Sequence, residues 1–270
     1  MNSKSTTLVC FVLALSATAV FSQQISVTEI SDKRTTGKFF AGLDVKLSAV
    51  GAGIADSKGL RRIKLDKAVD DTGRNLLRDE KFPKSAFDAE VSSPKGDALD
   101  FELSLANPSR QATMLREVSG YVELHTPQRD AKSVLSFGPL SGLLGKKLPL
   151  LGKLSITPVN KAQYEEMRKA NTSSNDGGEL VKALKQVFSG GMEADALGFL
   201  VQGDLNEVVA IEVTDAQGKA LPRQGRFSSG GFTAINFPGG PSPNALIKVY
   251  LATPQSITRI PIQLKAVALP

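Results

Sequence analysis

Asp70-Asp71-Thr72-Gly73-Arg74-Asn75-Leu76 is a seven-residue stretch that recurs 145 residues later as Asp215-Ala216-Gln217-Gly218-Lys219-Ala220-Leu221. Both copies have the form Asp-x-x-Gly-basic-x-Leu, and each follows an apolar-rich run that begins at Leu60 or Leu205. In a tight turn of this composition the Asp side chain accepts hydrogen bonds from the backbone, and Gly adopts a positive φ. Each copy therefore predicts a strand, a turn and a second strand that begins at Leu.

A second pattern also occurs twice. Residues 121–128, Tyr-Val-Glu-Leu-His-Thr-Pro-Gln, match residues 248–255, Lys-Val-Tyr-Leu-Ala-Thr-Pro-Gln, and in both places an alternating strand runs into a proline that ends it. The turn Asp precedes this Thr by 56 residues in the first copy and by 38 in the second. Two explanations stay open: an internal duplication with unequal copies, or the small set of residues that any β-rich chain can use in its turns.

The N-terminal 22 residues have the character of a secretion signal. Lys4 supplies the positive charge, and residues 8–21 are mostly apolar but short and rich in small side chains. The only cysteine, Cys10, lies inside this segment, so the mature chain would rely on its hydrophobic core alone, which about 250 residues can supply. We expect an exported protein, periplasmic or extracellular, with no transmembrane segment in its mature chain.

The charge balance limits the class of partner. The chain has 33 basic and 27 acidic residues, and removal of residues 1–22 takes away one lysine, which leaves 32 minus 27, or +5. This mild excess is compatible with an acidic envelope polymer but is far below the basic surface that a nucleic-acid-binding protein presents. We therefore expect an envelope or extracellular protein, or an anionic polymer, as partner, and no nucleic acid.

Alternating strands predict a first antiparallel β-sandwich over residues 23–159. Residues 43–50 alternate strictly, with Leu43, Val45 and Leu47 on one face, and similar runs recur without helices long enough for βαβ crossovers. The Gly- and Pro-interrupted, leucine-rich stretch 138–152 cannot form one regular element. Its leucines are expected either to cap the open end of this sandwich or to form an exposed docking patch.

The periodicity changes after Pro158. Asn160 is a predicted N-cap with Gln163 at the reciprocal position and Val159 set to pack on Tyr164, which predicts a helix through residue 170. A second helix is predicted over 179–188, so residues 160–191 would form a two-helix connector or a binding element. Strands resume to the C-terminus, and residues 192–270 are predicted to form a second, smaller β-sandwich.

Few residues suggest catalysis. Asp71-Thr72-Gly73 spells the aspartic-protease triplet, but Arg74 follows it, Asp70 precedes it and no second triplet exists. The sole histidine, His125, lies at a strand end without neighbouring residues at metal-ligand spacing. We expect no enzyme, no cofactor and no metal site; the alternative is a secreted hydrolase that uses the carboxylates of Asp70, Asp71 or Asp215, two of which would then face each other across a cleft at about 5 to 9.5 Å.

One predicted strand carries a cluster of basic residues that could contact a partner: Arg61, Arg62, Lys64 and Lys67. With Ile63 and Leu65 inward, Arg62 and Lys64 project to the other side. The cluster is either a solvated strand face that discourages edge aggregation or a contact for an anionic polymer or acidic partner.

In its signal segment, its paired Asp-x-x-Gly hairpins and its strand-Thr-Pro-Gln echoes, the chain resembles exported bacterial proteins built of immunoglobulin-like sandwich modules. This resemblance implies a non-catalytic envelope or surface protein with a structural or macromolecule-binding role.

Overall fold

The computed structural model describes residues 24–33, 41–51, 53–78, 94–172, 192–229 and 231–270. The chain is mainly β, with antiparallel sheets throughout, which confirms the predicted class in its broad form. Within these residues, four short 3₁₀ turns accompany the strands: η2 (Pro127–Arg129), η3 (Ala131–Ser133), η4 (Leu140–Gly142) and η5 (Leu205–Glu207).

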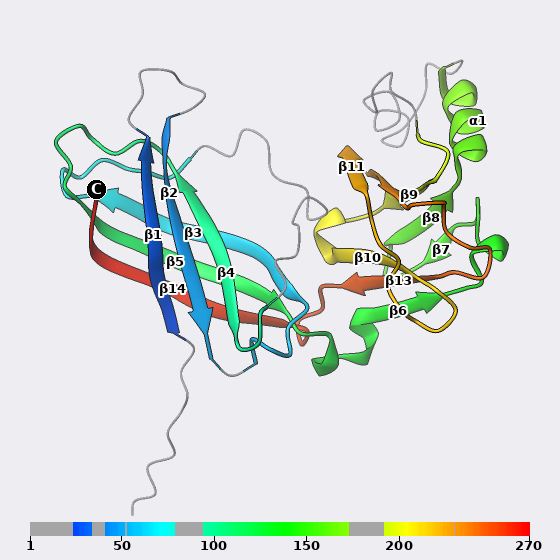
Figure 1. Ribbon diagram of the computed structural model, residues 1–270, viewed down its shortest axis with the longest axis horizontal. Coiled ribbons are helices and arrows are strands. Elements are labelled where there is room, and N and C mark those ends of the chain that lie inside the picture. Colours follow the sequence, from blue (N-terminus) through cyan, green and yellow to red (C-terminus); the bar gives the residue numbers. More distant parts are fainter. Residues whose placement is uncertain (1–23, 34–40, 52, 79–93, 173–191, 230) are drawn as a thin grey trace, which may run out of the picture.

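The first sheet pair consists of two three-stranded sheets that face each other (Figure 1). One sheet has the order β1-β2-β4 and contains β1 (Gln24–Lys33), β2 (Gly42–Val50) and β4 (Ala98–Leu105). The other has the order β14-β5-β3 and contains β3 (Gly59–Asp70), β5 (Met114–His125) and β14 (Ile257–Ala268). The inward residues of both sheets share one buried core, a sandwich-like arrangement that follows from their alternation.

The second sheet pair follows the same plan with more strands. A three-stranded sheet has the order β10-β13-β6 and contains β6 (Val134–Phe137), β10 (Val208–Thr214) and β13 (Leu246–Leu251). A five-stranded sheet has the order β11-β12-β9-β8-β7 and contains β7 (Leu148–Pro149), β8 (Ser155–Val159), β9 (Ala196–Gln202), β11 (Gly225–Ser229) and β12 (Phe232–Asn236). A second core lies between these sheets.

Helix α1 (Lys161–Thr172) covers the outer side of the five-stranded sheet. The predicted cap is confirmed, because the Asn160 side chain accepts from Gln163 N at 3.0 Å while the Gln163 side chain accepts from Asn160 N at 3.2 Å. Val159 and Tyr164 lie in one small buried cluster with Phe232. Since β9 has the helix on one side and a sheet on the other, its residues 196–201 are all buried. The predicted second helix, residues 179–188, lies outside the described residues.

Both Asp-x-x-Gly stretches form the predicted turns, with the same hydrogen bonds. Asp70 Oδ1 accepts from the backbone N–H of Thr72 and Arg74 at 3.0 and 2.9 Å, and Asp215 Oδ1 accepts from that of Gln217 and Lys219 at 3.0 and 2.8 Å. Gly73 and Gly218 have φ values of 89° and 84°, where a β-carbon would be strained.

The strand pairing crosses the domain boundaries expected from the sequence. β14, in the segment assigned to the second sandwich, pairs with β5, whereas β6, in the segment assigned to the first, pairs with β13. The division of the chain into domains at 159 and 192 stays a prediction, and the sheets do not follow it.

The leucine-rich stretch 138–152 packs on the second core and not on the first, so the expected cap on the first sandwich is wrong. Leu140 and Leu148 are buried there, and Leu143, Leu144 and Leu150 pack against the same cluster. Leu151 is the exposed member, at 38%.

Candidate functional site

The outer face of the β14-β5-β3 sheet gathers basic side chains around a tyrosine. Strand register places Arg62, Glu123 and Arg259 side by side, and the next row contains Lys64, Tyr121 and Pro261. We call this surface the basic face and define it by six residues: Arg62, Lys64, Lys67, Tyr121, Arg259 and Lys265. These side chains point outward because their strand neighbours, such as Val122 and Ile260, fill the core.

Tyr121 lies at the centre of the basic face, between two cations. The Cζ atom of Arg259 lies 4.8 Å from the ring centroid of Tyr121, and Nζ of Lys64 lies 5.8 Å from it. Cations at these distances are attracted by the ring quadrupole, which holds both side chains near the ring. The result is an aromatic surface flanked by positive charges.

The acids of this face are paired within the protein. Glu123 is 1% exposed and is contacted by three arginines: Arg61, Arg62 and Arg259. Burial alone would raise the pKa of Glu123, but the Arg62 hydrogen bond and the charges of Arg61 and Arg62 outweigh it and hold the pKa below its usual value. Glu117 lies 2.5 Å from Lys67 Nζ, and this hydrogen bond lowers its pKa.

The four basic residues singled out in the sequence do not stay together. Arg62, Lys64 and Lys67 lie on the basic face, whereas Arg61 sits in a bulge between Leu60 and Arg62 and bonds to Glu123 and to the backbone oxygen of Asn206. Their role in partner binding stays a prediction. Sequence reasoning missed Arg259 and Lys265, although the alternation of residues 259–265 would have placed them outward.

A second group of polar and charged residues lies where the two sheet pairs meet. We call it the junction cluster and define it by five residues: Lys58, Arg61, His125, Glu212 and Tyr250. Glu212 accepts a hydrogen bond from Tyr250 at 2.8 Å and pairs with Lys58 at 2.5 Å. Burial would raise the pKa of Glu212, but the hydrogen bonds from Lys58 and Tyr250 outweigh it and keep that pKa below its usual value.

His125 is fully buried in the junction cluster. Its Nε2 atom lies 3.0 Å from the Leu251 carbonyl oxygen, and because a carbonyl only accepts, the neutral ring carries its proton there. Burial, helped by the nearby charges of Arg61 and Lys58, outweighs the raising effect of the Leu251 hydrogen bond and lowers the pKa of His125 to about 4. The ring packs edge-on against Tyr250, with the two ring centroids 6.0 Å apart. His125 thus connects the end of β5 to the end of β13 at the junction.

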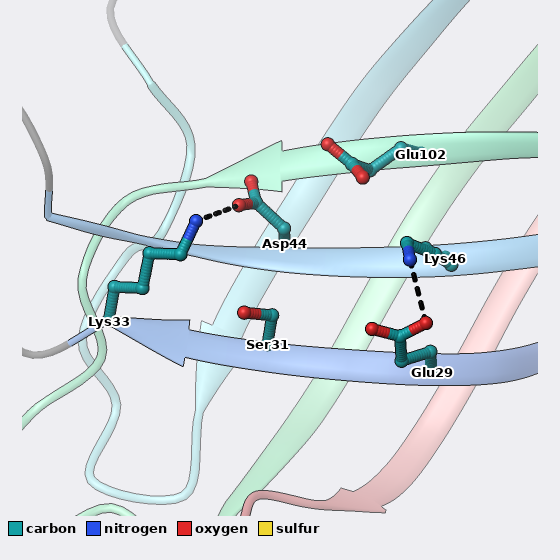
Figure 2. Close-up of a pocket in the computed structure, with 6 residues that line it drawn as sticks. All are labelled: Glu29, Ser31, Lys33, Asp44, Lys46 and Glu102. Carbon is teal, nitrogen blue, oxygen red and sulfur yellow. Dashed lines mark hydrogen bonds and ion pairs between the residues drawn. The ribbon is translucent and has the colours of Figure 1, made fainter.

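A shallow recess of about 230 Å³ lies on the outer face of the β1-β2-β4 sheet, and Figure 2 shows the side chains that line it: Glu29, Ser31, Lys33, Asp44, Lys46 and Glu102. Lys46 pairs with Glu29 at 2.7 Å and Lys33 approaches Asp44 at 3.8 Å. The recess is a ladder of cross-strand pairs on a solvated sheet face.

The carboxylates considered for hydrolysis are engaged in their own turns. Asp70 also accepts from Ser109 N at 2.9 Å, and Asp71 accepts from the Thr113 backbone and side chain. β3 and β10 both begin beside the strand ends at the junction, Gly59 opposite His125 and Val208 opposite Leu251, and lead away from it to their turns. The turns of Asp70 and Asp215 therefore lie at the ends of strands that belong to two different sheets.

Among the described residues no group of three or more His, Cys, Asp or Glu side chains could hold a metal ion. Over the same part of the chain no helix combines the length and the apolar character needed to cross a lipid bilayer.

No protein-family model, no curated protein and no solved structure matches this chain.

Proposed function

We propose that this chain is a non-catalytic exported protein of immunoglobulin-like sandwich modules, periplasmic or extracellular, that binds an anionic envelope polymer through its basic face. The observation that carries the proposal is the arrangement of Arg62, Lys64 and Arg259 around Tyr121 on the β14-β5-β3 sheet.

The charge of this face differs from that of the opposite face of the same sheet pair. The basic face has five bases, and Asp66, Glu117 and Glu123 lie on or beside it, which gives +2. The outer face of the β1-β2-β4 sheet has Lys33 and Lys46 against four acids, Glu29, Asp44, Asp100 and Glu102, which gives −2. A polyanion would be attracted to the first face and repelled by the second.

The form of the face also fits a polymer. Its side chains follow extended strands that lie side by side, so successive anionic groups of a linear chain could each meet one cation. The ring of Tyr121 could pack on the apolar side of a sugar unit between two such groups. Because Glu117 and Glu123 are paired internally, they oppose such a ligand less than free carboxylates would.

Binding to soluble polymers tests the proposal. We would titrate the purified protein with alginate, which carries carboxylates, with polyphosphate, and with neutral dextran at low and physiological salt. We expect binding to at least one polyanion, no binding to dextran, and weakening by salt because screening reduces charge contacts.

A double variant locates the site. Lys64→Glu with Lys265→Glu leaves the arginines around Glu123 in place, and we expect it to weaken binding about 10-fold or more, since each lost contact is worth about 0.7 kcal/mol. The matched control, Lys146→Glu with Lys147→Glu, changes net charge equally at exposed positions on the other sheet pair. Equal weakening by both pairs would show binding through net charge alone, and failure of the parent to bind either polyanion would refute the proposed function.

A further inference from the structure

Three strand pairings of the first sheet pair recur in the second. In the first, β1 pairs with β2, β2 with β4, and β3 with β5. In the second, β8 pairs with β9, β9 with β12, and β10 with β13. In chain order, β1, β2, β3, β4 and β5 thus correspond to β8, β9, β10, β12 and β13, and the second set adds β7, β11 and α1.

The repeated sequence patterns fall at corresponding places in this scheme. The Asp70 turn follows β3 and the Asp215 turn follows β10, with an equivalent backbone bond in each, Leu76 N to Ala68 O at 2.8 Å and Leu221 N to Val213 O at 2.9 Å. The Thr-Pro-Gln segments follow β5 and β13. The sequence repeats and the strand order therefore lead to the same correspondence between the two sheet pairs.

One of the three register shifts in the β3 ladder recurs in the β10 ladder. The β3 ladder shifts register between Leu60 and Arg62, opposite Leu124 and Glu123. The β10 ladder shifts between Val208 and Ala210, opposite Leu251 and Tyr250. Each bulge therefore lies at the same distance from its Thr-Pro-Gln segment, since both Leu124 and Leu251 precede the Thr by two residues. Bulges are specific features of a strand, so a bulge at matching places in β3 and β10 supports a common origin of the two strands.

The next strand breaks the simple repeat. After Thr126-Pro127 the chain leaves the first sheet pair and forms β6, which pairs with β13 of the second. After Thr253-Pro254 it returns and forms β14, which pairs with β5 of the first. The two crossings touch, because Thr126 N donates to Ser256 O at 2.7 Å. β6 and β14 occupy corresponding edges, each in the other half of the chain.

We propose that the chain is a tandem duplication of a six-strand module whose two copies have exchanged their last strands, so that each copy provides a strand-accepting edge for the other. The edge of β5 takes β14, and the edge of β13 takes β6. Ile260 and Ile262 of β14 are fully buried in the first core, so the first copy is incomplete without a strand that lies beyond the second.

Site-specific cleavage of the folded full chain tests the exchange. One variant carries a protease recognition sequence between Arg129 and Asp130, a second carries it between Pro254 and Gln255, and a third carries both. After either single cut we expect one species in gel filtration, because one crossing stays covalent and the exchanged strand stays bound. After the double cut we expect the peptide 255–270 to elute with residues 1–129. Its elution with residues 130–254, or separation after a single cut, would overturn the exchange.

A turn transplant tests the equivalence of the copies. The four substitutions Ala216→Asp, Gln217→Thr, Lys219→Arg and Ala220→Asn give the second turn the sequence of the first. Because both turns bond the backbone alike, we expect an unchanged urea midpoint, whereas Gly218→Ala, at a φ of 84°, should lower it. A transplant that lowers the midpoint as much as Gly218→Ala would contradict equivalence. Neither experiment depends on polymer binding, so failure here leaves the proposed function standing.

Discussion

Arg61 donates a hydrogen bond to the backbone oxygen of Asn206, a residue 145 positions later in the chain, while its guanidinium also pairs with buried Glu123. The separation of 145 is the offset between the two Asp turns. One arginine thus joins β5, in the first sheet pair, to the segment that leads into β10, in the second. The bulge at Leu60 and Arg62 is what turns Arg61 toward this contact.

Loss of the Glu123 carboxylate should be costly. Glu123→Ala leaves Arg61, which has an 11% exposed side chain, without its buried counter-ion, and we expect a loss of about 3 to 5 kcal/mol in the free energy of unfolding. Glu123→Gln keeps an acceptor and should cost less. Urea denaturation measures both, with Glu117→Gln as the control, because the pair of Glu117 with Lys67 is half exposed and solvent screens it. Equal losses in the free energy of unfolding for the variants at 117 and 123 would contradict a buried charge pair between Glu123 and Arg61.

Acidification should weaken the fold through His125. Its folded-state pKa of about 4 lies below the ordinary value of 6.5, so the unfolded chain binds the proton more tightly. The contribution of neutral His125 to the free energy of unfolding is fully present above pH 6.5. It falls as the pH drops toward 4, by at most about 3 kcal/mol. His125→Gln can still donate to Leu251 O and should flatten the profile between pH 6.5 and 4.5. An unchanged slope in that variant would mean that other groups carry the effect.

The two turn aspartates should differ in their contribution to stability despite their equivalent bonds. Asp70 is fully buried and accepts four hydrogen bonds, including one from Ser109, so Asp70→Ala leaves buried N–H groups unsatisfied and should cost about 3 kcal/mol. Asp215→Ala acts in an exposed turn and should cost about 1 kcal/mol. Thermal unfolding of both variants checks the order, and a larger loss at 215 would refute it.

The pH dependence of Asp70 has a defined sign. Burial would raise the pKa of Asp70, but bonds from Ser109, Thr72 and Arg74 lower it below the usual 3.8. Its contribution is present above pH 3.8 and is lost as pH falls below that value. This range lies below that of His125, so the two effects can be separated.

Local chemistry explains which parts of the fold the sequence predicted. Asp and Gly specify the turns through their own bonds and dihedrals, and Asn160 with Gln163 specifies the helix start, so each required only neighbouring residues. Alternation likewise predicted which residues of 43–50 are buried. These features depend on short stretches of chain.

The strand exchange and the course of Arg61 could not be predicted in this way. Alternation in residues 257–268 shows which side chains face inward but not which strand lies beside them, and its partner β5 begins more than 140 residues earlier. Arg61 reads as one member of a basic strand until the bulge, which carries no sequence signal here, rotates it away from Arg62.

A core substitution near the C-terminus should destabilise the N-terminal half of the chain. Ile262 of β14 is fully buried against the first core, and Ile262→Ala should cost about 2 to 5 kcal/mol by leaving a cavity. In hydrogen exchange, we expect protection to fall first in β5 and β2, whereas Ile247→Ala, at a fully buried site in β13, should first affect β10 and β6. Because Ile247 and Ile262 are close in sequence, a common pattern of lost protection would contradict their assignment to different cores.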